Sequence, residues 1–183
     1  MIKDRIKKLR HYFNKYKIDG YVIPKNDEYF SEYSEINRLK TISNFSGSAG
    51  IAIILKNKNY LFVDGRYTLQ AKIESGKYFT LVSYDKIINC KLFKNLTLGI
   101  DSKLLTSSQV KNYFSKYNKV KIIDNNLIDK IKKFPLKRNK PFYSLDDKIV
   151  GQSHFSKITN IATYLQKKKA DYIFISAPEN IAW

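Results

Sequence analysis

The sequence contains few residues of several types, and each scarcity argues against a class of protein. Cys90 is the only cysteine in 183 residues, so neither an intrachain disulfide nor a cysteine-based zinc site can form. With 7 glycines and 4 prolines, the chain is neither collagen-like nor of low complexity. No apolar run approaches the roughly 18–20 residues that span a bilayer, and the charged first residues lack an apolar signal region. We therefore expect no membrane association, no secretory signal and a reducing cytoplasmic location.

Acidic residues and arginine are also scarce. The 34 Lys and Arg residues outnumber the 16 Asp and Glu residues, which gives a formal net charge of +18 that would attract a polyanion. However, 29 of the basic residues are lysines spread along the whole chain. Only 5 are arginines, the residue best suited to bidentate phosphate and base contacts. The excess of Lys, Ile, Asn and Tyr is typical of an A+T-rich genome, which we favour over a nucleic-acid partner.

The hydrophobic pattern predicts both helices and strands. Apolar residues at helical spacing over 2–17 predict an N-terminal helix, which we expect Gly20 to end as a left-handed cap. Residues 50–64 predict a β-hairpin with a turn at 56–59. The fold class expected is therefore α/β, with a mixed β-sheet flanked by helices. Further strands are predicted at 21–23, 78–82, 98–101 and 120–123, and further helices at 67–74, from 106 and at 126–134.

The chain is predicted to contain one domain and the beginning of another. Residues 1–134 form the first domain, and 135–148, which include two prolines, read as a linker. Residues 149–183 begin a second, similar domain, because a helix at 157–169 leads through Lys-x-Asp into a strand at Tyr172–Ile175, as the first helix does at Tyr21. A lone helix and strand cannot bury their apolar faces. We therefore expect the chain to be a fragment of a longer protein.

No complete active site is predicted. His11 and His154 belong to no metal-ligand spacing, so both are interpreted as surface histidines. Phosphate-binding glycine loops and the G-x-S-x-G motif are missing, and Ser48 has no evident histidine partner.

Four short motifs follow one another along the chain: D-E-Y-F-S-E-Y at 27–33, N-F-S-G-S-A-G at 44–50, V-D-G-R-Y-T-L-Q-A at 63–71 and N-L-I-D at 126–129. In this order and spacing they resemble the N-terminal domain of the creatinase/aminopeptidase P family, most closely that of cytosolic Xaa-Pro aminopeptidases. Three residues depart from the family pattern: Tyr29 replaces a His, Asn44 a Gly and Lys132 a Trp. The first departure weakens a chemical role for the loop at 27–33.

Two of these motifs have a structural interpretation. The turn is expected to need glycine for its backbone angles, with small residues between the glycines for close packing. The next motif is expected to convert a strand end into a helix start, with a capping carboxylate. The residues are Gly47, Ser48, Ala49 and Gly50 in the turn, and Asp64 and Gly65 in the connection.

Other motif residues are candidates for a substrate cleft. Arg66 follows a strand, at the edge where α/β sheets often carry sites. It would pair with Asp64 or Glu74, or else project toward a cleft formed with a catalytic domain. Local hydrogen bonding is the preferred interpretation of the candidates in the 27–33 loop. The cleft candidates are Arg66, Tyr67, Glu32 and Tyr33.

The resemblance implies an enzyme that removes the first residue from peptides whose second residue is proline. It implies two divalent metal ions, with manganese the usual metal, held by two Asp, one His and two Glu in a separate catalytic domain. This chain would then hold no cofactor and be inactive alone, while shaping the cleft and subunit contacts such as those of a homodimer. Two alternatives stay open: a module that binds nucleic acid or an acidic surface, and a stand-alone regulatory remnant of a split peptidase gene.

Overall fold

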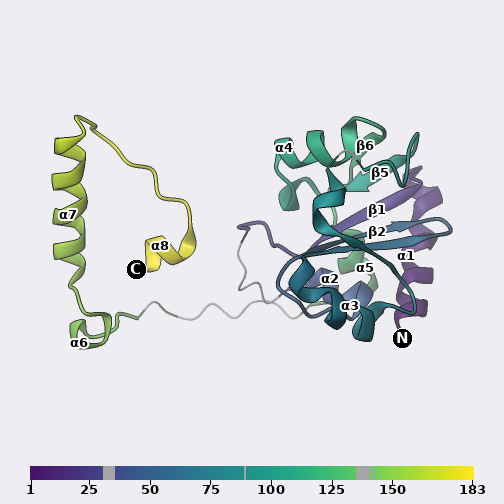
Figure 1. Cartoon of the computed structure of the whole chain (residues 1–183), viewed down its shortest axis with the longest axis horizontal. Coiled ribbons are helices and arrows are strands. Elements are labelled where there is room, and N and C mark those ends of the chain that lie inside the picture. The colour runs from purple at the N-terminus through teal and green to yellow at the C-terminus, as the bar shows by residue number, and fades with distance from the viewer. Residues whose placement is uncertain (31–35, 89, 135–140, 142) are drawn as a thin grey trace. The chain divides into compact units, whose positions relative to one another are not determined.

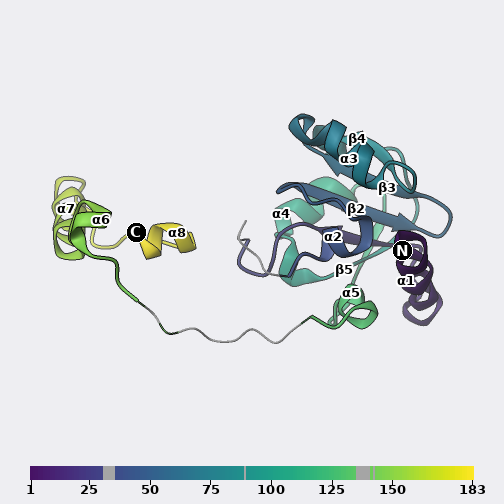
Figure 2. The ribbon, with the colours of Figure 1, turned by 90° about the horizontal axis from the view of Figure 1, so that it is seen from below.

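The computed structural model describes residues 1–30, 36–88, 90–134, 141 and 143–183. The chain divides into two compact units, Met1–Pro135 and Leu136–Trp183, which are drawn in Figures 1 and 2. Within the described residues, no helix is both long and apolar enough to cross a bilayer.

One mixed β-sheet organises the first unit. Among the described residues, six strands lie in the order β4-β3-β2-β1-β5-β6. The central pairs β1–β2 and β2–β3 are antiparallel, whereas β3–β4, β1–β5 and β5–β6 are parallel. The expected mixed sheet is thus confirmed. The strands are β1 Gly20–Pro24, β2 Gly50–Leu55, β3 Asn59–Val63, β4 Thr80–Ser83, β5 Thr97–Ile100 and β6 Lys119–Ile122.

Helices cover both faces of this sheet, which is why β1 and β2 read as continuous apolar runs. Helix α1 buries Ile2, Ile6, Leu9 and Phe13 in one core, to which α2, α3 and α5 contribute. A second core on the other face contains Phe93 and residues from the region of α4; Figure 1 shows α4 above β1 and β2, and α2, α3 and α5 below them. The helices are α1 Ile2–Tyr16, α2 Arg38–Ser43, α3 Thr68–Ser75, α4 Ser107–Val110 and α5 Leu127–Ile131.

The end of α1 differs from the prediction. Lys17, with φ of 50°, is the left-handed cap, and Gly20 is instead the first residue of β1. A Cβ at Gly20 would lie 2.5 Å from Leu55 Cδ2 and 3.0 Å from the Ile54 carbonyl oxygen of the neighbouring strand. Glycine therefore favours the close approach of β1 and β2, and Lys17 accepts the left-handed conformation.

The second unit consists of helices and connecting segments. It contains α6 Asp147–Val150, α7 His154–Lys167 and α8 Pro178–Ala182. Helix α7 begins earlier than predicted, because Ser153 caps it through a bond from the Ser156 amide. The strand predicted at Tyr172–Ile175 is not formed. These residues have no neighbouring strand in the described part of this unit, and a strand is defined by hydrogen bonds to a neighbour.

Candidate functional site

The sheet register places the G-S-A-G turn next to the D-G-R-Y helix start. Because β2 and β3 are antiparallel, Gly50 at the start of β2 pairs with Val63 at the end of β3. The turn precedes Gly50 and the 3₁₀ turn Gly65–Tyr67 follows Val63, so both motifs lie at one edge of the sheet. The two motifs, which are separated in the sequence by the β2–β3 hairpin, are therefore neighbours in the fold.

Side-chain hydrogen bonds connect the turn to α3. Glu74 accepts from the Ser46 amide at 2.7 Å and from Ser46 Oγ at 2.7 Å. Gln70 Nε2 donates to Ser46 Oγ at 2.8 Å and to Glu74 Oε1 at 3.2 Å. The hydroxyl groups of Ser48 and Tyr67 share a further bond of 2.8 Å. We call these five residues the turn–helix latch.

The hydrogen bonds of the latch lower the pKa of its carboxylate, Glu74. Partial burial alone raises the pKa of Glu74, but the bonds from Ser46 and Gln70 outweigh burial and leave that pKa below its ordinary value. Glu74 is therefore engaged by the turn and is not the partner of Arg66.

The space beneath the turn explains its glycines. Gly47 and Gly50 do not have the positive φ angles expected of them. A Cβ at Gly47 would instead lie 2.3 Å from Cζ of Phe45, and one at Gly50 would lie 3.1 Å from the Phe62 carbonyl oxygen. Phe45 is wholly buried and packs edge-on against Tyr67, with ring centroids 5.9 Å apart. The glycines are needed for space rather than for backbone angle.

The connection after β3 positions Arg66. Asp64 Oδ1 accepts from the Arg66 amide at 3.0 Å and from Arg66 Nε at 2.9 Å. This ion pair holds the pKa of Asp64 below its ordinary value. The Arg66 side chain is 75% exposed, and its guanidinium carbon lies 5.6 Å from the Tyr67 ring centroid. Two of the cleft candidates, Arg66 and Tyr67, therefore lie together, whereas Glu32 and Tyr33 fall outside the described residues.

The N-L-I-D motif connects α5 to α2. Asp129 accepts two bonds from Arg38, at 2.7 Å from Nε and 2.8 Å from Nη2. Asn126 caps α5 through the Ile128 amide and donates to Asp101 Oδ2 at 2.9 Å. Only 10% of the Arg38 side chain is exposed. This motif therefore joins two helices under the sheet.

Sequence reasoning missed two of these features, the roles of Ser46 and Arg38. A signal existed for half of the latch, because Gln70 and Glu74 are four residues apart and so share one helix face. Nothing in the sequence identified their partner, which lies 28 residues before Glu74.

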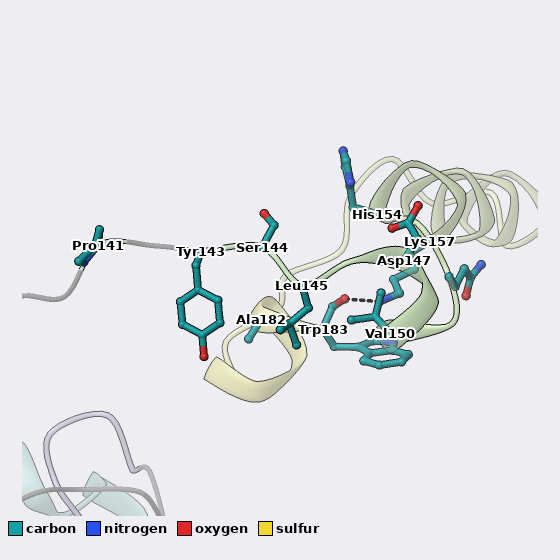
Figure 3. A pocket seen from close by; sticks show the side chains of 11 residues that line it. Pro141, Tyr143, Ser144, Leu145, Asp147, Val150, His154, Lys157, Ala182 and Trp183 are labelled. Atoms are coloured by element: carbon teal, nitrogen blue, oxygen red, sulfur yellow. Dashed lines mark hydrogen bonds between the residues drawn. The ribbon is translucent and has the colours of Figure 1, made fainter.

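The second unit has a pocket of about 570 Å³ that includes residues from α6, α7 and the last two positions. Lys157 Nζ donates to the Trp183 carbonyl at 2.6 Å and lies 3.5 Å from the indole centroid. Figure 3 shows His154 pointing away from this bond.

The described residues do not fit a two-metal centre. Across 1–30, 36–88, 90–134, 141 and 143–183, no three His, Cys, Asp or Glu residues are grouped so that they would hold a metal ion. We therefore derive no metal-dependent step from this chain.

The fold and its motifs define an α/β domain with a six-stranded mixed sheet whose turn and helix start are bonded to each other. The sequence matches the family model described as "Creatinase/Prolidase N-terminal domain" over residues 5–131, and a second model of the same description over 133–183. The chain belongs to the creatinase/prolidase N-terminal domain family.

Relatives similar in sequence are Xaa-Pro aminopeptidases by name. A "Probable Xaa-Pro aminopeptidase P" from Laccaria bicolor is 33% identical over 98% of this chain and 30% of its own length. "Xaa-Pro aminopeptidase 1" from Dictyostelium discoideum is 30% identical over 100% of this chain and 33% of its own. The chain therefore spans about a third of the length of the curated relatives it matches.

Solved structures share the fold. The X-prolyl aminopeptidase from Caenorhabditis elegans, described as a cytosolic enzyme with a di-nuclear active site, matches with a TM-score of 0.73 and 24% identity over 93% of this chain and 32% of that one. The N-terminal domain of the cytoplasmic peptidase PepQ from Mycobacterium tuberculosis matches with a TM-score of 0.54 and 17% identity, over 70% of this chain and 98% of that one.

Proposed function

We propose that this chain is the N-terminal part of an Xaa-Pro aminopeptidase, and that it shapes the substrate cleft and subunit contacts without supplying catalytic groups. One observation carries the proposal: the family match extends over residues 5–131 and 133–183. The relatives that share this region are about three times longer and are named Xaa-Pro aminopeptidases.

The hydrogen bonding of the motifs supports a scaffold role. The polar groups of the latch bond to one another, and those of the N-L-I-D motif bond to α2 and to Asp101. Groups satisfied in this way position backbone and are not poised to react. The Arg66 side chain is 75% exposed, so we propose that it and Tyr67 form part of the cleft wall, together with Glu32 and Tyr33.

The complete enzyme would use two divalent metal ions, with manganese as the family resemblance implies. The di-nuclear site named for the Caenorhabditis elegans enzyme is consistent with this number. The ligands would come from outside this chain, and the location would be the cytosol, as described for that enzyme. Residues 149–183 would begin a second, similar domain after a linker at 135–148, in keeping with the second family match. The substrate would be a peptide with proline in second position.

A turnover assay tests this proposal. The purified 183-residue chain is incubated with an Xaa-Pro peptide, with and without Mn²⁺, beside the Caenorhabditis elegans enzyme as a positive control. We expect the positive control to release the first residue and the chain to give no hydrolysis above the blank. Hydrolysis by the chain would overturn the proposal. So would a reading frame past Trp183 without the expected two Asp, one His and two Glu.

A further inference from the structure

A small pocket lies where β1 ends, beside the turn of the latch. It has a volume of about 140 Å³, and its lining includes Lys25 and Asn26 after β1, residues 48–50 of the turn, and Tyr84. The Lys25 amide donates to the Gly50 carbonyl at 3.0 Å, which fixes one wall of the pocket to the other. The pocket is therefore built on the sheet and on the turn that the latch holds.

The Lys25 side chain is buried, and no described residue serves as its counterion. Lys25 is only 9% exposed, and lysines buried to this degree are normally paired. In the part of the chain that the structure describes, its ammonium takes part in no hydrogen bond or ion pair. The ammonium is also absent from the fully enclosed unpaired groups, which are Arg5 Nε and Arg38 Nη1. It therefore keeps some solvent access, and Lys25 is one of the residues that line the pocket.

No negative charge on the described lining of the pocket opposes an anion, because that lining contains no carboxylate. The nearby Asp27 carboxylate accepts from the Tyr29 amide at 3.0 Å, and the Asn26 amide group donates to the Leu104 carbonyl at 2.8 Å. Burial, followed by the neighbouring Tyr113, raises the pKa of Tyr84 to about 12, so its hydroxyl stays protonated. A buried cation without a partner is costly, and an anion in the pocket would remove much of that cost.

We propose that this pocket binds a single carboxylate group, with Lys25 as its charge partner. A volume of about 140 Å³ is several times the roughly 30 Å³ that a water molecule occupies. It accommodates a carboxylate with a few carbon atoms and excludes a nucleotide. The carboxylate comes either from the C-terminus of a peptide or from an acidic side chain of another polypeptide. The proposal does not depend on peptidase activity, so it stands or falls separately from the proposed function.

Amide NMR titrations of the 183-residue chain test the proposal. Acetate is added at constant ionic strength, with chloride as the reference anion. We expect saturable shifts of the backbone amides at residue 25 and residues 48–50, with a millimolar dissociation constant. Glycyl-prolyl-glycine should bind there if the source is a peptide C-terminus, and N-acetyl-aspartate methylamide if it is an acidic side chain. The C-terminal amide of the tripeptide should not bind.

Two variants distinguish the specific contribution of Lys25 to acetate binding from that of the chain's overall positive charge. Lys25→Met keeps an apolar stem and removes the ammonium, and should weaken acetate binding by at least about tenfold. Lys86→Met makes the same change at an exposed lysine near Tyr84 and should leave the affinity within about twofold. The proposal is overturned if the wild-type chain shows no saturable shift up to about 100 mM acetate, or if Lys25→Met binds as tightly as wild type. If Lys25→Met does not fold, the comparison of acetate with chloride in the wild-type chain still decides, because saturable binding of acetate alone is expected for either source.

Discussion

Replacing Asp129 with asparagine should destabilise the first unit more than removing its partner does. Arg38 is 10% exposed and Asp129 is 40% exposed. Without Asp129, the guanidinium stays buried and keeps only the weaker attraction of the Asp101 and Glu28 carboxylates. Without Arg38, the Asp129 carboxylate is still hydrated. Loss of one partner from a fully buried pair costs about 3–5 kcal/mol. Because Asp129 is partly exposed, we expect Asp129→Asn to cost about 2–3 kcal/mol and Arg38→Met about 1 kcal/mol.

Urea unfolding followed by circular dichroism measures these differences, with equal m-values required for a valid comparison. Asp124→Asn is the matched control, because Asp124 is an exposed aspartate five residues away; it should change stability by less than about 0.5 kcal/mol. The double variant Arg38→Met/Asp129→Asn should be no less stable than Asp129→Asn, because the unpaired charge is gone. The reasoning is refuted if Arg38→Met costs as much as Asp129→Asn, or if Asp129→Asn costs less than about 1 kcal/mol.

Three further predictions concern the latch and the second unit. The folded pKa of Glu74 is lowered, so its stabilisation is present above the unfolded pKa of about 4.3 and is lost as pH falls through the folded pKa. Glu74→Gln should therefore differ most from wild type in urea midpoint near neutral pH and converge with it in acid; a constant difference would contradict this. Gly47→Ala should cost about 1–3 kcal/mol in urea unfolding because of Phe45, whereas Gly65→Ala, with nothing within 4 Å of the added Cβ, should be neutral or slightly stabilising; equal effects would refute the packing argument. Amides at 172–176, outside any helix or strand, should exchange with solvent deuterium almost as fast as in an unfolded chain in dilute solution, and protection equal to that of β2 would contradict this.

Local patterns in the sequence were sufficient to predict most elements of the first unit. The spacing of Ile2, Ile6, Leu9 and Phe13 encodes one helix face, and α1 buries these residues. The hairpin at 50–64 is equally predictable from the sequence, because only the polar turn at 56–59 interrupts its apolar runs.

Features that depend on distant contacts were not predictable from such patterns. The sequence predicts Gly20 as the helix cap, but Lys17 adopts the left-handed conformation, and Gly20 lies in β1 where a Cβ would crowd the Ile54 carbonyl oxygen and Leu55. The run Tyr172–Ile175 has strand composition, yet a strand also requires a neighbour, which composition does not provide. In the latch, no local pattern identifies Ser46 as the partner of Glu74, because the two residues are 28 positions apart in the sequence and meet only in the folded chain.

Metal stoichiometry tests the central claim most directly, namely that the catalytic groups of the proposed aminopeptidase lie outside this chain. The purified 183-residue chain is dialysed to equilibrium against Mn²⁺, and the protein-bound metal is counted by elemental analysis. Because the described residues contain no group of three or more His, Cys, Asp or Glu that could hold a metal ion, we expect no stoichiometric binding. Two tightly held Mn²⁺ ions per chain would contradict the claim.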